Sequence, residues 1–246
     1  MTLFKKQKTP PPAGRGRGAK TLKTTTGKLS VSIPATLAEV TLGQMMALQQ
    51  NPNLGDIEAI SILSGIPVEE LQNVQSMDDF AIFGEAVLSL SQQIKHLYDS
   101  DAIPKKITFS NDKTVNVISN LSVEPAGAFM AARDIIGDEI SEHIKLYGDE
   151  DWQQYFNPSL KACCQVLAHY FYCRATGKPY NEYEAEEFTA EIKKLGVTEA
   201  LPIAKHFFTC YPSLSKPKTG FFHRLQRRLN ERLAYRRSKS LNTLTR

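Results

Sequence analysis

Apolar residues recur every three or four positions along most of the chain, which is the spacing of one face of an α-helix. The clearest stripe consists of Phe80, Phe83, Val87, Leu90, Ile94 and Leu97. Ser76 followed three residues later by Asp79 forms a relaxed capping box, so it predicts where this helix begins. Such a stripe is buried against neighbouring elements, and we expect a helical body.

Two shorter helices are expected before this one. Thr41 is placed to cap a helix that ends at the break formed by Asn51-Pro52. A second apolar stripe over residues 57–63 ends at Gly65. Pro67 then stands where proline is tolerated, at the first turn of a further short helix.

The second half of the chain predicts four more helices, each with a recognisable start and stop signal. Their expected bounds are Pro125 to Gly137, Asn157-Pro158 to Gly177, Asn181 to Gly196, and Thr198 to a close at Pro212.

The period of the pattern changes from about 3.6 to 2 in two places. Leu29 to Ile33 alternates apolar and polar residues and stops at Pro34, which predicts a short strand. Residues 107–109 and 114–117 flank the polar turn Ser110 to Lys113, which predicts a β-hairpin. We therefore expect a mainly α fold with a small β element (α+β), built from the strand and the hairpin.

Charge divides the chain into three parts. Residues 1–28 carry eight basic side chains and no acidic one, and residues 216–246 carry ten against Glu231 alone. The net charge of +4 therefore conceals an acidic middle of −13 between ends of +8 and +9. Such ends are typical of segments that contact nucleic acid, an acidic partner or the body of the same chain.

The same pattern predicts the domain organisation. Residues 1–28 form a basic tail rich in proline and glycine, which we expect to be disordered on its own. An N-terminal helical subdomain with the short strand follows at 29–100, and a subdomain of hairpin and helices at 101–215. Residues 216–246 form a basic amphipathic segment.

That last segment is the strongest candidate for partner binding. Its apolar residues are Phe221, Phe222, Leu225, Leu229 and Leu233, and its arginines are Arg224, Arg227, Arg228, Arg232, Arg236 and Arg237. An apolar stripe beside arginines predicts a docking helix that orders on a partner, while the arginines alone would also suit nucleic acid. In the N-terminal tail, we expect six basic residues to contact phosphate or an acidic surface: Lys5, Lys6, Lys8, Arg15, Arg17 and Lys20.

Catalytic and metal-binding patterns are weak. Cys163, Cys164 and Cys173 lie in one apolar stretch without the paired spacing of structural zinc sites, so we expect free, buried thiols on one helix. Thr26-Gly27-Lys28 lacks the leading glycine and the strand of a phosphate-binding loop. The acidic run at residues 182–187 fits a solvated face or a docking patch for a basic segment better than general acid–base catalysis.

These absences favour a non-enzymatic protein without a cofactor or a metal. The chain has no G-x-S-x-G or H-E-x-x-H motif. Its first residues contain no apolar run of a secretory signal, and no stretch of about 18 apolar residues predicts a membrane span. We therefore expect synthesis in the cytoplasm and no membrane span.

Several short segments carry a family resemblance. They are Val31 to Pro34 with Val40 to Gln44, Ile62 to Ile66, the hairpin Ile107 to Val117 with Ile118 to Leu121, Gly127 to Phe129, Tyr170 to Tyr180 with Arg174, and Phe207-Phe208. Together, over about residues 29–212, they resemble tailed-bacteriophage morphogenesis proteins of the tail-assembly-chaperone-like and virion-assembly type.

The resemblance implies a protein of the host cytoplasm that acts during assembly by binding other phage tail or virion proteins, with self-association left open. An alternative is a structural component of the head–tail junction or the particle interior, whose basic ends contact DNA, portal or neighbouring rings. A third, from another class, is an enzyme whose site has no recognisable motif.

Overall fold

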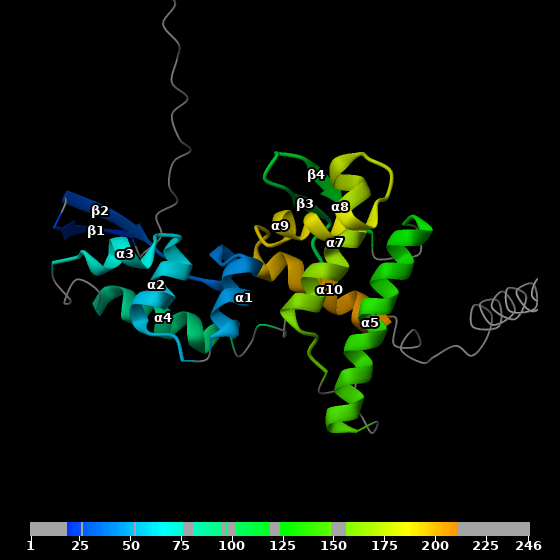
Figure 1. Ribbon diagram of the computed structural model, residues 1–246, viewed down its shortest axis with the longest axis horizontal. Helices are drawn as coiled ribbons and strands as arrows, with labels where there is room; N and C mark the ends of the chain where they lie inside the picture. Colours follow the sequence, from blue (N-terminus) through cyan, green and yellow to red (C-terminus); the bar gives the residue numbers. More distant parts are fainter. Residues whose placement is uncertain are drawn as a thin grey trace, which may run out of the picture.

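The computed structural model describes residues 19–25, 27–51, 53–75, 81–94, 97, 102–118, 124–148 and 156–210. Its elements form two lobes with a short connection between them (Figure 1). The first lobe contains β1 (Ala19–Thr24), β2 (Gly27–Ser32), α2 (Asp56–Ser64), α3 (Val68–Gln72) and α4 (Ala81–Ile94). The second contains β3 (Lys106–Thr108), β4 (Thr114–Asn116), α5 (Ala126–Tyr147), α7 (Leu160–Thr176), α8 (Glu182–Glu187), α9 (Thr189–Ile192) and α10 (Val197–Cys210). The prediction of a mainly α fold with a small β part is confirmed.

The first hairpin corrects the predicted extent of the disordered tail. β2 coincides with the expected strand, but β1 also forms a strand, antiparallel to β2, with Leu22 opposite Leu29. Leu22 is fully buried, and the Thr25 amide donates to the Asn73 carbonyl over 3.0 Å, so β1 is held on both edges. The prediction of disorder is therefore wrong from residue 19 onward, because one buried leucine and paired backbone groups outweigh a basic, threonine-rich composition.

The second hairpin confirms its prediction and is separate from the first. Ile107 pairs with Val115, and Asp112 adopts the left-handed conformation (φ 59°) in the turn between them. Asn111 supports the turn, because its Oδ1 accepts from the Lys113 amide over 3.1 Å. Within the described residues β1–β2 and β3–β4 are two independent sheets, so the β part is not one element.

A short segment joins the lobes and consists of η1 (Leu37–Glu39) and α1 (Leu42–Gln50). Thr41 caps α1 through the predicted contact and forms a capping box with Gln44, whose Nε2 also donates to the Leu63 carbonyl of α2 over 2.9 Å. On the other side, the amide of Gly43 donates to the Lys193 carbonyl over 2.8 Å. A Cβ at Gly43 would lie 3.0 Å from that carbonyl oxygen, so glycine permits this close approach.

The core of the second lobe is α7, as its apolar composition predicts. Ser159 caps its start by accepting from the Ala162 amide over 3.2 Å, and Gly177 ends it in the left-handed conformation. Phe171 of α7 and Phe207 of α10 are both fully buried, and Phe171 contacts Phe109 of the hairpin edge to face at 5.6 Å. α7 is therefore packed on nearly all sides.

Several predicted boundaries are wrong. The helix expected from Asn181 to Gly196 is two short helices, α8 and α9, and α9 ends at Ile192. α7 begins at Leu160, after the expected start at Asn157-Pro158. α5 continues through Gly137 to Tyr147, because the apolar period that includes Ile136 and Ile140 extends past the glycine. α10 begins at Val197, so Thr198 lies in its first turn and is not its cap. Pro67 is the residue before α3 and lies outside its first turn. The capping box at Ser76 and Asp79 and the close at Pro212 lie outside the described residues.

Candidate functional site

Most residues that the sequence predicts as partner-binding lie outside the described residues. This applies to the whole C-terminal set from Phe221 to Arg237 and to the N-terminal set from Lys5 to Arg17. Lys20 alone is described: it lies on β1 opposite Val31 and is partly buried. The docking-helix hypothesis stays a prediction, and the described body offers a different surface for interaction.

This surface is on α5, the longest described helix. Its buried residues Ala128, Ala132, Ile136 and Ile140 are spaced by four and face α7. The C-terminal part of α5 extends beyond the helices that cover the rest of it (Figure 1). Leu146 and Tyr147 near its end are 76% and 75% exposed. We call these two residues the α5 tip.

A row of aromatic rings connects the α5 tip to the core. The Tyr147 ring lies 4.7 Å from His143, which in turn lies 5.1 Å from Phe156. Phe156 contacts Phe208 of α10 at 5.8 Å. The Nε2 atom of His143 is buried and has no hydrogen-bond partner among the described residues. The tip is thus the exposed end of a packed apolar cluster, unlike a singly exposed residue such as Leu88.

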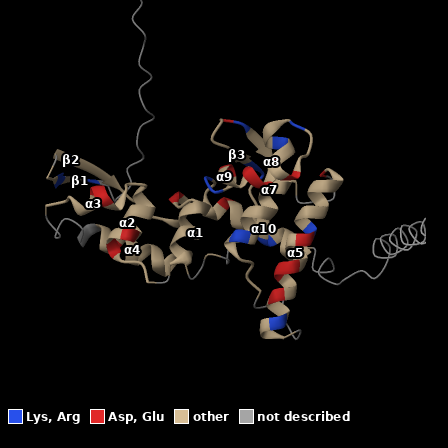
Figure 2. Cartoon of the chain, in the orientation of Figure 1, with Lys and Arg blue, Asp and Glu red and all other residues tan. Residues whose placement is uncertain are grey.

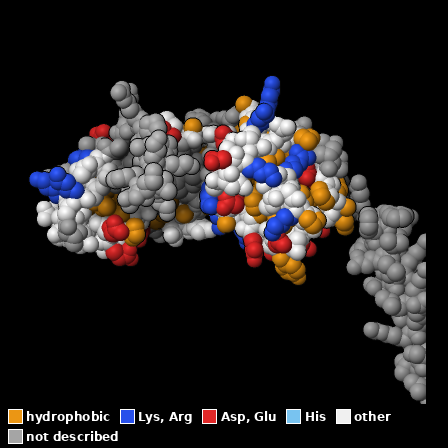
Figure 3. Space-filling model, turned by 90° about the horizontal axis from the view of Figure 1, so that it is seen from above, with side chains coloured by type: hydrophobic (Ala, Val, Ile, Leu, Met, Phe, Trp, Pro, Cys, Tyr) orange, Lys and Arg blue, Asp and Glu red, His pale blue; other side chains and the backbone are white. Residues whose placement is uncertain are grey.

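Acidic side chains lie on the outer face of the same helix (Figure 2). Asp134, Asp138 and Glu142 are spaced by four and are all exposed, and we call them the acidic face of α5. Arg133 forms an ion pair with Asp134 at 2.7 Å, so part of this charge is compensated. Hydrophobic side chains are also exposed between charged ones over the second lobe (Figure 3).

A buried ion pair fixes the chain just before α5. Glu124, whose side chain is 3% exposed, pairs with Arg174 of α7. Burial raises the pKa of the Glu124 carboxyl, and the Arg174 charge opposes this rise. The guanidinium also lies 5.1 Å above the Tyr170 ring and donates to the Asn116 carbonyl over 3.3 Å. Arg174 therefore ties α7 to the hairpin and to the start of α5.

Two further contacts determine how α5 lies on its neighbours. The Ser159 amide donates to Oε1 of Glu139 over 2.6 Å, which connects the middle of α5 to the N-terminus of α7. At the other end, Gly127 lies directly against the Tyr180 ring, leaving no space for a Cβ. These contacts and the ion pair make α5 a rigid support for the tip.

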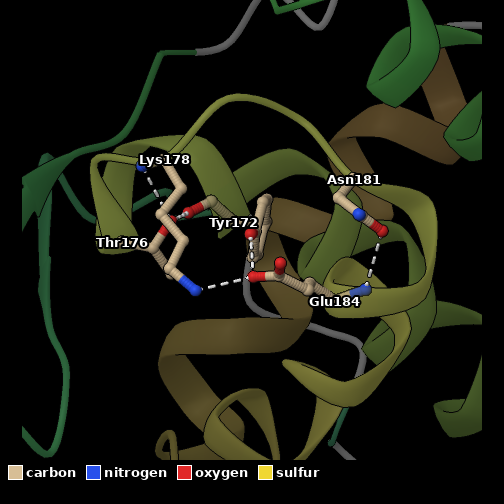
Figure 4. A network of polar contacts seen from close by, with 5 residues as sticks. All are labelled: Tyr172, Thr176, Lys178, Asn181 and Glu184. Carbon is tan, nitrogen blue, oxygen red and sulfur yellow. Dashed lines mark hydrogen bonds and ion pairs between the residues drawn. The ribbon is translucent and has the colours of Figure 1, made fainter.

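A polar network closes the loop between α7 and α8 (Figure 4). Glu184 Oε2 accepts from the Tyr172 hydroxyl over 2.5 Å and from the Lys178 ammonium over 2.7 Å. The Glu184 amide donates to Asn181 at the N-cap of α8 over 3.3 Å, and the Thr176 hydroxyl donates to the Tyr172 carbonyl over 2.7 Å. Hydrogen bonds from Lys178 and Tyr172 lower the pKa of Glu184. One carboxylate of the acidic run is therefore used within the fold, while Glu182, Glu186 and Glu187 are exposed.

The cysteines of α7 are free, as expected, but only two of them are buried. Cys163 and Cys164 are buried and Cys173 is half-buried. Burial raises the pKa of Cys164 to about 11, so this sulfur remains a thiol at neutral pH. Across the part of the chain that the structure describes, no three His, Cys, Asp or Glu side chains are grouped so that they could hold a metal ion.

No protein-family model matches this chain, and the searches of curated proteins and of solved structures found no match either. Among the described residues, no helix has both the length and the apolarity needed to cross a membrane.

Sequence analysis missed the α5 surface because the helix was expected to stop at Gly137. The signals were nevertheless present: Ile136, Ile140 and Ile144 keep one apolar spacing, and Asp134, Asp138 and Glu142 keep a parallel acidic one. A glycine inside a helix costs about 1 kcal/mol, which the burial of Ile136 and Ile140 exceeds.

Proposed function

We propose that the protein is a bacteriophage tail or virion assembly protein that acts by binding other proteins, in the manner of a tail-assembly chaperone. One observation carries the binding part of this proposal: the α5 tip leaves Leu146 and Tyr147 about three-quarters exposed at the end of a rigid, packed helix. Large apolar side chains presented in this way are typical of protein–protein contacts. The phage part rests on the sequence resemblance.

The acidic face of α5 adds a charge preference to the tip. Asp134, Asp138 and Glu142 would steer a partner that presents basic side chains next to an apolar patch. The segment at 216–246 of this chain has that composition, and a second copy would bring it in trans. Binding to a tail protein and self-association can therefore use the same surface.

The binding surface can be tested by substitution in the proposed phage. Leu146→Asp and Tyr147→Ser should each reduce plaque formation strongly, because truncating a central apolar anchor costs about 2 kcal/mol or more, roughly 30-fold in affinity. Leu88→Asp is the matched control, since Leu88 is 61% exposed on α4 in the other lobe. Unchanged plaque counts for both tip variants would refute the role of this surface.

The stage of assembly can be tested separately. A phage lacking the gene should produce DNA-filled heads without tails under the electron microscope, and normal particles would refute an assembly role. Mass spectrometry of purified wild-type particles then distinguishes an assembly chaperone from a permanent virion component. An assembly chaperone should be absent from them.

A permanent virion component is the second candidate, and the charge of the chain ends favours it. The ends carry +8 and +9 around an acidic middle, which suits contact with packaged DNA or with portal and ring proteins. Under this alternative the same mass spectrometry should find the protein in particles at a fixed copy number.

A further inference from the structure

A second surface, separate from the α5 tip, has the properties of a ligand site. An open cavity of about 270 Å³ lies where α1, in the segment that joins the lobes, meets α7, α8 and α9 of the second lobe. The residues that line it are Met46, Lys161, Cys164, Gln165, His169, Glu186, Thr189 and Lys193. Three of them, Lys161, Glu186 and Lys193, are exposed, and we call these three the rim. Cavities that enclose whole drug-sized molecules are larger, so this volume suits a single small polar group.

The inner wall is closed by side chains that are already hydrogen-bonded. The Cys164 thiol donates to the Thr189 carbonyl over 3.7 Å, which is within range for sulfur. Because burial keeps this thiol protonated, it is neither a nucleophile nor a metal ligand here. The wall therefore contributes shape and leaves recognition to His169 and the rim.

His169 lines the cavity and has one ring nitrogen engaged by a described residue. Its side chain is 96% buried, since only 4% is exposed, and its Nδ1 lies 2.9 Å from the Tyr180 hydroxyl. Burial raises the pKa of Tyr180 to about 12, so the phenol keeps its proton. Among the described residues Nδ1 is the one hydrogen-bond partner of that phenol, and which of the two groups donates depends on the tautomer of the imidazole. Where the phenol donates, the neutral ring carries its proton on Nε2, for which the described residues supply no hydrogen-bond partner.

The charges at the rim favour an anion. Lys161 and Lys193 are both exposed at the cavity mouth, and neither forms an ion pair with a described residue. Glu186 partly offsets the charge of these lysines. Burial lowers the pKa of His169, and the charges of Glu186 and Glu182 oppose this lowering. Two lysines and one glutamate leave one net positive charge at the rim, beside the N–H donor. This balance matches a singly charged oxyanion better than a doubly charged one.

We propose that this cavity is a carboxylate-binding site: the Tyr180 hydroxyl donates to His169 Nδ1, His169 Nε2–H donates to one carboxylate oxygen, and Lys161 and Lys193 neutralise the charge. The carboxylate belongs to a small organic acid or to an acidic side chain of a bound protein segment. Recognition is the same in both cases, because it uses the planar group and its charge.

The test uses the full-length protein labelled with ¹⁵N at histidine and follows the imidazole nitrogens by NMR. Butyrate and N-acetyl-glutamate-amide, each with a single carboxylate, are titrated separately, with chloride at equal ionic strength as the reference. The proposal expects saturable shifts at one histidine, absent in His169→Gln and absent with chloride. Tighter binding of butyrate assigns the site to a free acid, and tighter binding of the capped glutamate assigns it to a protein segment.

Lysine variants make the test independent of whether His169→Gln folds well. Lys161→Gln and Lys193→Gln should each weaken carboxylate binding about three- to tenfold. Lys194→Gln is the matched control: Lys194 is next in sequence, pairs with Glu191 at 2.5 Å and does not line the cavity. Equal weakening by all three substitutions, or tighter binding of inorganic phosphate than of either carboxylate, would overturn the proposal.

Discussion

Replacing Gly127 with alanine should destabilise the protein, although Gly127 lies in the first turn of a helix. An ideal Cβ at this position would stand 2.7 Å from both Cδ1 and Cε1 of the Tyr180 ring. Carbon atoms in contact are normally about 3.5–4.0 Å apart, so the ring must move by roughly 1 Å. The ring is held by the hydrogen bond between its hydroxyl and Nδ1 of His169, and moving the ring would lengthen that bond.

The magnitude follows from two opposing effects. Overpacking of this kind costs about 1–3 kcal/mol. Alanine in place of a helical glycine returns about 0.5–1 kcal/mol through backbone entropy. We therefore expect Gly127→Ala to lower the free energy of unfolding by about 1 kcal/mol, measured by urea unfolding with linear extrapolation.

Two controls separate the steric effect from the helical one. Gly84→Ala in α4 should stabilise by about 0.5–1 kcal/mol, because no described atom lies within 4 Å of a Cβ there. In a Tyr180→Ala background, Gly127→Ala should also become stabilising, since the obstructing ring is gone. If Gly127→Ala stabilises the otherwise unchanged protein as much as Gly84→Ala does, the close contact with Tyr180 does not exist as described.

Three other predictions concern stability. Arg174→Ala should lower the free energy of unfolding by about 3 kcal/mol in urea titrations, because it leaves the Glu124 carboxylate buried and unpaired. Adding Glu124→Gln should recover part of the loss, and no recovery would contradict the ion pair. The free energy of unfolding should fall as the pH drops below 6.5, because burial lowers the pKa of His169 in the folded protein while the same histidine in the unfolded chain takes up a proton near 6.5. Urea unfolding midpoints measured from about pH 7.5 to 5 should show a smaller fall in His169→Gln. Thr41→Ala should cost about 1 kcal/mol through loss of the α1 cap, whereas Thr41→Ser should cost less, by the same titration.

Local signals made α7 predictable from sequence alone. Gly177 ends α7 in the left-handed conformation, as predicted. Its start was expected two residues early, at Asn157-Pro158, whereas the N-cap is Ser159, which makes the capping contact that its residue type favours. The same holds for Thr41 of α1 and for the turn at Asn111 between β3 and β4. In these places the contacts that fix the structure lie within a few residues of one another.

Features that depend on distant residues were not predictable in this way. The strand β1 is stable because Leu22 is buried and because Lys23 and Thr25 bond to the segment after α3. Glu124 and Arg174 are separated by fifty residues of sequence, and nothing in their local surroundings marks them as a pair. The cavity at His169 likewise depends on α1, whose position relative to α7 no single-sequence pattern specifies.

The segment that joins the lobes, η1 and α1, has a consequence for the protein while it is being synthesised. Thr41 bridges to Gly196, 155 positions further along the chain, and the Val197 amide donates to the Val40 carbonyl. At about 5–20 residues per second, a ribosome needs roughly 10–30 s to reach Gly196 after it has added Thr41. Throughout that interval the backbone groups of this segment lack their final partners, and Leu42 and Met45, both buried in the finished fold, lack part of their cover. Any premature stop before residue 197 would release a chain permanently in that condition, so nascent or truncated copies should be the aggregation-prone and protease-sensitive forms of this protein.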